Sequence, residues 1–166
     1  AIPFIDIQAD IEAVANTYDF SIANLDVPIP MGWGRISTYF SVRKKIFGIG
    51  IPFLAKAQLF GGAGINSHNV TPKLSSELIV NSGLETILED AIGNPSSFNA
   101  TDFGDKLLDY AQENRETFKG AHVMVGLQAK LLTFNMIANF RYTMAKDVIP
   151  GKSGFPSAYI GLGIGI

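Results

Sequence analysis

The chain has 166 residues and a formal net charge of −2, and 47% of its residues are apolar while 17% are charged. The charged share is below the roughly 25% of soluble domains. The chain has no basic surplus and no cysteine, which argues against a nucleic-acid partner and excludes disulfides and thiolate chemistry. Its length predicts a single domain over residues 1–166. No stretch approaches the ~20 consecutive apolar residues of a membrane helix. The chain begins at Ala1 without a leader, which we interpret as a processed or trimmed product.

The first predicted strand covers residues 5–16, where apolar and polar residues alternate. Side chains of an extended chain switch faces at every residue, so this strand has one apolar and one polar face. A loop is predicted over residues 18–31, because its prolines cannot donate to a strand ladder. The apolar face carries Ile7 and Ile11, and the polar face carries Asp6, Gln8, Asp10 and Glu12.

A long β-hairpin is predicted over residues 33–66, with a short connection at residues 48–52. Its residues also alternate with a period of two, which is typical of strands with two different faces. The apolar face carries Ile36, Phe40 and Val42, and the polar face carries Arg35, Arg43, Lys56 and Gln58.

Between residues 67 and 119 the apolar residues recur at helical spacing instead of alternating. One helix is predicted over residues 84–92, and a second covers residues 103–111 with Thr101 as its N-cap. Acidic residues outnumber basic ones in this stretch. We therefore predict that residues 67–119 form an inserted, extracellular helical loop. This loop either packs on itself, caps or enters a pore, or docks other subunits of a membrane complex.

Alternation returns in a second predicted hairpin, which has a tight turn near residues 131–133, and in a final strand over residues 158–166. A loop at residues 148–156 precedes the final strand and contains two prolines and two glycines. Six strands are therefore predicted in all. The apolar face of these segments carries Val123, Val125, Leu127, Ile160, Leu162 and Ile164, and the polar face of the hairpin carries Gln128 and Arg141.

Alternation alone does not decide which face meets water, because a soluble barrel with an apolar lumen and a membrane barrel with an apolar exterior share the pattern. If the strands run up and down, the two short turns lie at one end and the three long connections at the other. Outer-membrane barrels have this asymmetry. The polar face of the final strand is mostly glycine, and aromatic residues fall near both strand ends, as in interfacial belts. These features favour a membrane barrel.

On these alternating segments and this loop asymmetry, the chain resembles bacterial outer-membrane β-barrel proteins of a porin-like or fatty-acid-transporter-like kind. The resemblance implies an antiparallel up-and-down transmembrane β-barrel that contacts outer-membrane lipid. It also implies a channel or transporter, or a structural component of an outer-membrane assembly, with no cofactor. Such barrels need at least eight strands, so the six found here imply missing N-terminal strands or strands shared between subunits. The alternative is a soluble lipocalin-like barrel that binds an apolar ligand.

In the membrane interpretation the polar rows face the lumen and the apolar rows face lipid. Acidic residues of the first strand are then expected to pair with basic residues of the neighbouring hairpin. Such pairs form either a charged constriction that filters solutes or the salt-bridged plug of a closed barrel. His68 is predicted in a loop and His122 on a polar strand face, and their spacing predicts no metal site. No combination of nucleophile, base and acid points to an enzyme.

Overall fold

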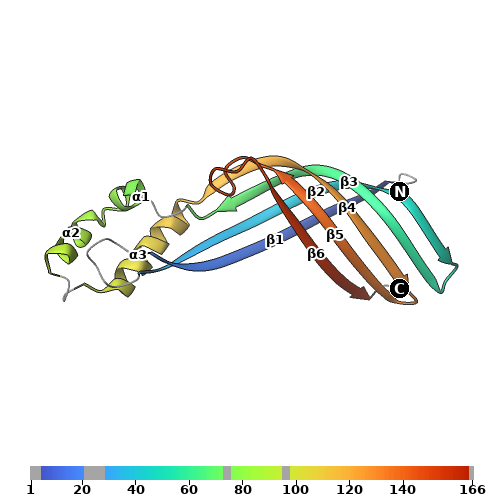
Figure 1. Ribbon diagram of the computed structural model, residues 1–166, viewed down its shortest axis with the longest axis horizontal. Helices are drawn as coiled ribbons and strands as arrows, with labels where there is room; N and C mark the ends of the chain where they lie inside the picture. The colour runs from blue at the N-terminus through green and yellow to red at the C-terminus, as the bar shows by residue number, and fades with distance from the viewer. Residues whose placement is uncertain (1–4, 21–28, 73–75, 95–97, 165–166) are drawn as a thin grey trace. The chain divides into compact units, whose positions relative to one another are not determined.

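The computed structural model describes residues 5–20, 29–72, 76–94 and 98–164. Over these residues the protein is mainly β, with six antiparallel strands in one sheet and three short helices between the third and fourth strands (Figure 1). The strands follow one another across the sheet in sequence order, as predicted. The elements are β1 (Ile5–Phe20), β2 (Ile29–Ile51), β3 (Ala55–Val70), α1 (Ser76–Asn81), α2 (Glu85–Gly93), α3 (Ala100–Glu113), β4 (Glu116–Leu131), β5 (Phe134–Met144) and β6 (Phe155–Ile164).

The β4–β5 hairpin fixes the register of the second half of the sheet. Leu131 lies opposite Phe134 across a two-residue turn, and Ala121 lies opposite Met144. In the next pairing Phe134 lies opposite Ile164. Since directly opposed residues point to the same side of a sheet, these pairings join the apolar rows of three strands into one continuous face.

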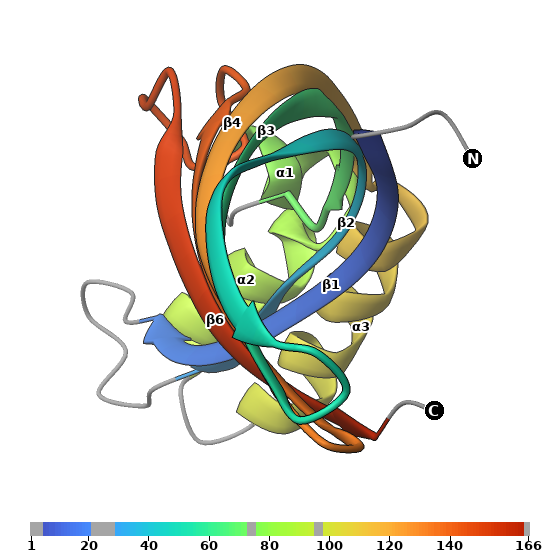
Figure 2. The ribbon, with the colours of Figure 1, turned by 90° about the vertical axis from the view of Figure 1, so that its right-hand side faces the viewer.

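Over residues 5–11, 37–68 and 118–164 the sheet is curled like a half-barrel (Figure 2). Hydrogen bonding joins each strand to the next but does not return from β6 to β1 within the described residues, so these two strands are the edges of the sheet. The predicted closure of the barrel is therefore not reached in this part of the chain. The same residues include no helix that is both long enough and apolar enough to cross a membrane.

The chain divides into two compact units, which are described separately. Residues 1–11, 37–68 and 118–166 form what we call the sheet unit, which holds both short turns. Residues 12–36 and 69–117 form the helical unit, which holds α1, α2 and α3 together with neighbouring strand ends.

The helical unit has an apolar core of its own. Leu107 and Phe103 of α3 are almost completely buried, and they pack with Met31 from β2 and with Ile79 and Leu84 from the first helical segment and its connection. Helix α3 begins at an N-cap, Asn99, whose side-chain oxygen accepts a hydrogen bond from the Asp102 backbone N–H at 3.1 Å. The insertion thus packs on itself and on the ends of β1 and β2, since Tyr18 also contacts this core.

Several predicted boundaries are wrong. Strand β1 continues to Phe20 and β2 begins at Ile29, so the connection between them is shorter than the predicted loop over residues 18–31, and its residues 21–28 lie outside the described part. These strand ends continue because Tyr18 and Met31 pack on the helical core. Strand β2 also continues to Ile51, which moves the first short turn from residues 48–52 to residues 52–54.

The insertion also differs in detail from the prediction. Strand β3 continues to Val70 and β4 begins at Glu116, so the helical segment is shorter than residues 67–119. Its described residues form three helices instead of the predicted two. The additional helix, α1, was not predicted because its 6 residues are too few to show a helical period. The N-cap of α3 is Asn99, whereas Thr101 lies inside the helix.

Candidate functional site

Buried and exposed positions in the sheet unit are distributed in the reverse of a soluble barrel. Side chains on the inner face of the curl are mostly polar and buried, and the large residues on the outer face are apolar and exposed. Arg141, His68 and His122 are each no more than 1% exposed, whereas Ile7 and Leu162 are 78% and 83% exposed. Burial of polar groups is tolerated only when they are hydrogen-bonded or paired, so the contacts of the inner face decide what it can do.

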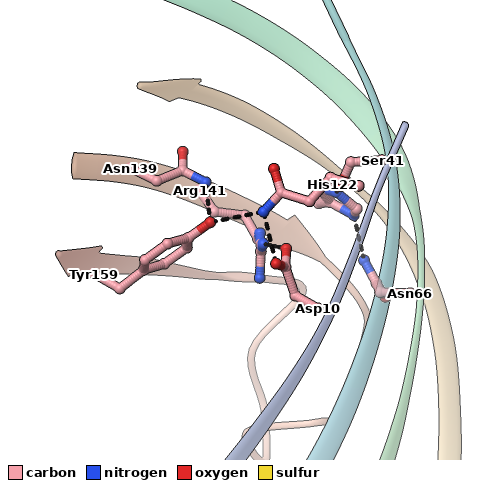
Figure 3. Close-up of polar contacts among 8 residues, drawn as sticks. Asp10, Ser41, Asn66, His122, Asn139, Arg141 and Tyr159 are labelled. Carbon is pink, nitrogen blue, oxygen red and sulfur yellow. Dashed lines mark hydrogen bonds and ion pairs between the residues drawn. The ribbon is translucent and has the colours of Figure 1, made fainter. Parts of the chain in front are cut away.

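An ion pair joins Arg141 of β5 to Asp10 of β1 on the inner face (Figure 3). The Arg141 Nη2 atom is 2.5 Å from the Asp10 Oδ2 atom. The guanidinium carbon also lies 3.8 Å from the centroid of the Tyr39 ring, which is within the range of a cation–π contact. Because β1 is one edge of the sheet and β5 lies next to the other edge, this pair connects the two sides of the curl.

A second connection between the two sides passes through Tyr159 of β6. The Tyr159 hydroxyl accepts hydrogen bonds from the Asn139 side chain at 2.8 Å and from the Gln8 side chain at 3.0 Å. Asn139 and Tyr159 lie opposite each other on β5 and β6, while Gln8 comes from β1. Side chains from both edge strands therefore meet across the interior.

Two buried histidines share one asparagine on the same face. Asn66 Oδ1 is 2.9 Å from His68 Nε2, and Asn66 Nδ2 is 3.5 Å from His122 Nδ1. With the amide in this orientation, His68 Nε2 donates and His122 Nδ1 accepts. The remaining ring nitrogens lie 2.8 Å from Ser37 Oγ and 2.8 Å from Ser41 Oγ, respectively. Each ring is thus satisfied as a neutral imidazole, which has one donor and one acceptor.

Tyr39 packs between these groups. Its ring meets both His68 and His122 edge to face, with centroid distances of 5.5 Å and 5.2 Å, and Arg141 covers it. Such edge-to-face contacts stabilise a fixed packing of the rings. Tyr39 and its neighbours therefore fill the interior at this level.

We call this set of residues the inner polar cluster. It consists of Gln8, Asp10, Ser37, Tyr39, Ser41, Asn66, His68, His122, Asn139, Arg141 and Tyr159.

The predicted lumen residues fall into several groups. Asp10, Gln8 and Arg141 belong to the inner polar cluster. Gln58 donates to Gln128 at 2.6 Å, which joins β3 to β4. The predicted pairing of acids on β1 with bases on β2 occurs for two pairs. These are Asp6 with Arg43, at 3.8 Å in the sheet unit, and Glu12 with Arg35, in the helical unit. Lys56 has no ion-pair partner among the described residues, and Asp10 pairs with Arg141 instead.

All predicted lipid-facing residues are exposed, with exposed fractions between 44% for Val125 and 83% for Leu162. Within each strand they occupy alternate positions, so they point to one side of their strand; Ile36 belongs to the helical unit and the others to the sheet unit. The set is Ile7, Ile11, Ile36, Phe40, Val42, Val123, Val125, Leu127, Ile160, Leu162 and Ile164.

Several members of the inner polar cluster were not predicted as site residues. His68 lies within β3, so its predicted place in a loop is wrong. The alternation signal fades there because residues 66–69 are all polar. Tyr39 and Tyr159 stand on the polar rows of their strands, but the sequence gives no indication that they contact the central ion pair.

The Ser41–His122 pair has the spacing of a nucleophile and its base, but not the surroundings. The second ring nitrogen of His122 faces the amide of Asn66, whereas a catalytic triad places a carboxylate there. Among the described residues no group of three or more His, Asp or Glu side chains has the arrangement of a metal site. The geometry is that of a packed polar interior.

Comparisons of the chain with known proteins do not extend this description. No family model matches the chain, and neither the curated proteins nor the solved structures show a significant match to it.

Proposed function

We propose that the chain is part of the wall of a bacterial outer-membrane β-barrel, which acts as a channel or transporter or as a structural component of an outer-membrane assembly. The observation that carries this proposal is the inside-out distribution of side chains in the sheet unit. Its buried positions hold Arg141, His68 and His122, while its exposed face is lined with large apolar residues. Exposing such a face to water is unfavourable, whereas lipid accepts it at little cost.

Strand length supports the same conclusion. A transmembrane strand needs about 9–11 residues, and β5 and β6 have 11 and 10 residues. Their exposed apolar residues extend from Tyr142, near one end, to Phe134 and Ile164 at the short-turn end. These two strands are therefore long enough to cross a bilayer core.

The packing of the inner polar cluster favours a closed interior over an open pore. Tyr39, Ser37 and Thr143 have no exposed surface, and Arg141 is paired across the curl. An open aqueous channel would leave these side chains in contact with water. We therefore favour a structural or gated role, in which solute passage requires the cluster to rearrange.

Membrane insertion tests the proposal, with Val125→Arg as the perturbation. Arginine at a lipid-facing position near mid-bilayer costs about 2–4 kcal/mol, so this variant should insert poorly into vesicles and lose protease protection. The matched control is Gln112→Arg, which adds the same charge on the exposed surface of α3. It should insert as the native protein does.

Two results would contradict the proposal. The first is that Val125→Arg inserts as efficiently as Gln112→Arg, and the second is that the native protein stays monomeric and soluble without detergent. The second result would direct attention to the soluble alternative, in which an apolar ligand or partner covers the exposed face.

A further inference from the structure

The two short turns carry bulky apolar residues at positions that favour glycine. Phe53 and Leu132 have φ angles of 62° and 53°, in the left-handed region that bulky side chains seldom adopt. Both side chains are exposed, Phe53 completely. Turns of this kind usually contain Gly, Asn or Asp. Bulky side chains seldom adopt this backbone conformation, so apolar side chains at both turns indicate that the turns contact an apolar surface.

Two lysines, Lys56 and Lys130, lie beside these turns, and a third, Lys45, lies farther along β2. A 2.8 Å backbone hydrogen bond from the Leu132 N–H to the Leu54 carbonyl sets the register of β3 and β4, and the side-chain hydrogen bond between Gln58 and Gln128 agrees with it. Lys56 and Lys130 lie two residues nearer the turns on each strand, so they stand opposite each other on the same face. Like charges in this position repel each other. Lys45 joins them in lining a hollow of about 670 Å³ at the turn end. We call these three residues the lysine cluster.

The lysine cluster differs from the other cations of the inner face in having no acidic partner. Arg43 pairs with Asp6, and Arg141 pairs with Asp10. None of the three lysines forms an ion pair or side-chain hydrogen bond with a described residue, and the lining of the hollow contains no acid. Three positive charges around one hollow without a counter-charge form a site for an anion.

The position of the lysine cluster along the strands indicates the source of the anion. The exposed apolar rows extend to the turns, where Leu131, Phe134 and Ile164 are 58%, 66% and 82% exposed. If these rows contact the bilayer core, the turns lie at the level of the phosphate groups of one leaflet. Lysine side chains are long and carry their charge toward such groups while their methylene chains stay against apolar surface.

We infer that the lysine cluster binds the phosphate group of an anionic phospholipid that reaches the hollow from the turn end, with Phe53 and Leu132 at the membrane interface. The inference rests on the proposed function and adds a lipid class to it. The size of the hollow is within the 300–1,000 Å³ common for ligand sites. Juxtamembrane lysines strengthen the attraction to anionic lipid cumulatively.

The test compares lipids added to the protein in a zwitterionic detergent. Phosphatidylglycerol should bind at least about tenfold more tightly than phosphatidylcholine when lipid adducts are counted by native mass spectrometry. The variant Lys45→Gln/Lys56→Gln/Lys130→Gln should lose this preference. The control variant, Lys119→Gln/Lys146→Gln/Lys152→Gln, removes the same charge from exposed positions that do not line the hollow and should keep the preference.

A folding measurement accompanies the binding test. Because the lysine cluster repels itself, its glutamine variant should unfold at a temperature at least as high as the native protein when only phosphatidylcholine is present. A large loss of stability there would show that the lysines have a partner within the protein and would overturn the inference.

The remaining outcomes separate the inference from the proposed function. A protein that inserts into vesicles but shows no preference for phosphatidylglycerol, or a control variant that loses the preference as well, overturns the lipid site and leaves the membrane barrel standing. Equal stabilisation by millimolar inorganic phosphate would make the ligand a free anion instead of a lipid. Failure to insert at all would overturn the proposed function itself.

Discussion

Replacing Asp10 by asparagine tests whether the interior of the sheet unit is closed to water. The substitution keeps the shape of the side chain but removes the charge that lies 2.5 Å from Arg141. Arg141 is 1% exposed, so its guanidinium would remain buried without a counter-charge. Losing one partner of a buried ion pair costs about 3–5 kcal/mol. The contact with Tyr39 offsets only part of this cost, since a cation–π contact contributes about 0.5–2 kcal/mol and is already present in the native protein.

The measurement is the free energy of unfolding in urea, followed by circular dichroism in detergent micelles. Adding Arg141→Met to Asp10→Asn should recover most of the lost stability, because the double variant has no buried charge at this site. Asp6→Asn is the control. Its carboxylate is mostly exposed and lies 3.8 Å from Arg43, so its removal should cost less than about 1 kcal/mol.

A cost below about 1 kcal/mol for Asp10→Asn would refute the reasoning. It would mean that water reaches Arg141, so that the lumen is open at this level. A double variant less stable than Asp10→Asn alone would likewise contradict the account of an uncompensated buried charge.

Two further substitutions test the packing of each unit. Gly64→Ala should destabilise the β2–β3 pairing by more than about 2 kcal/mol, because its Cβ would collide with the Phe40 carbonyl oxygen; Gly163→Ala, which meets nothing within 4 Å, should be neutral in the same urea titration. Leu107→Ala should cost about 2–5 kcal/mol and raise amide hydrogen exchange in α1–α3, since this side chain is fully buried in the helical core. Unchanged exchange in the three helices would contradict the assigned core.

The two faces of each strand could be predicted because the signal is local. Burial alternates with a period of two, so Ile36 and Arg35 fall on opposite faces whatever the rest of the chain does. The β4–β5 hairpin could be predicted for the same reason, because its two strands are adjacent in the sequence and are joined by a short turn. Around His68 the residues on both faces are polar, so the alternation of apolar and polar residues disappears and the end of the strand could not be predicted.

The partners within the inner polar cluster could not be predicted in the same way. Asp10 was expected to pair with a base of the neighbouring strand, but its partner Arg141 lies far along the chain. That contact depends on how strongly the sheet curls, which is a property of the whole sheet and not of any segment. The lysine cluster has the same origin, because only the register of β3 and β4 brings Lys56 opposite Lys130.

The connection between β3 and β4 has a consequence for how the sheet assembles. Strands β4, β5 and β6 follow one another over residues 116–164, so their pairing closes short loops, whereas joining β3 to β4 spans residues 71–115. Long loops delay such pairings because closure entropy must be overcome first. Here the helices of the spanning segment form an apolar core together with Met31 and Tyr18, and a 2.7 Å hydrogen bond from Thr117 to Asn69 joins the strand ends that flank the segment. Flanking ends that are held together in this way reduce the search for the β3–β4 pairing to that of a short loop, once the ends of β1 and β2 have completed the helical core.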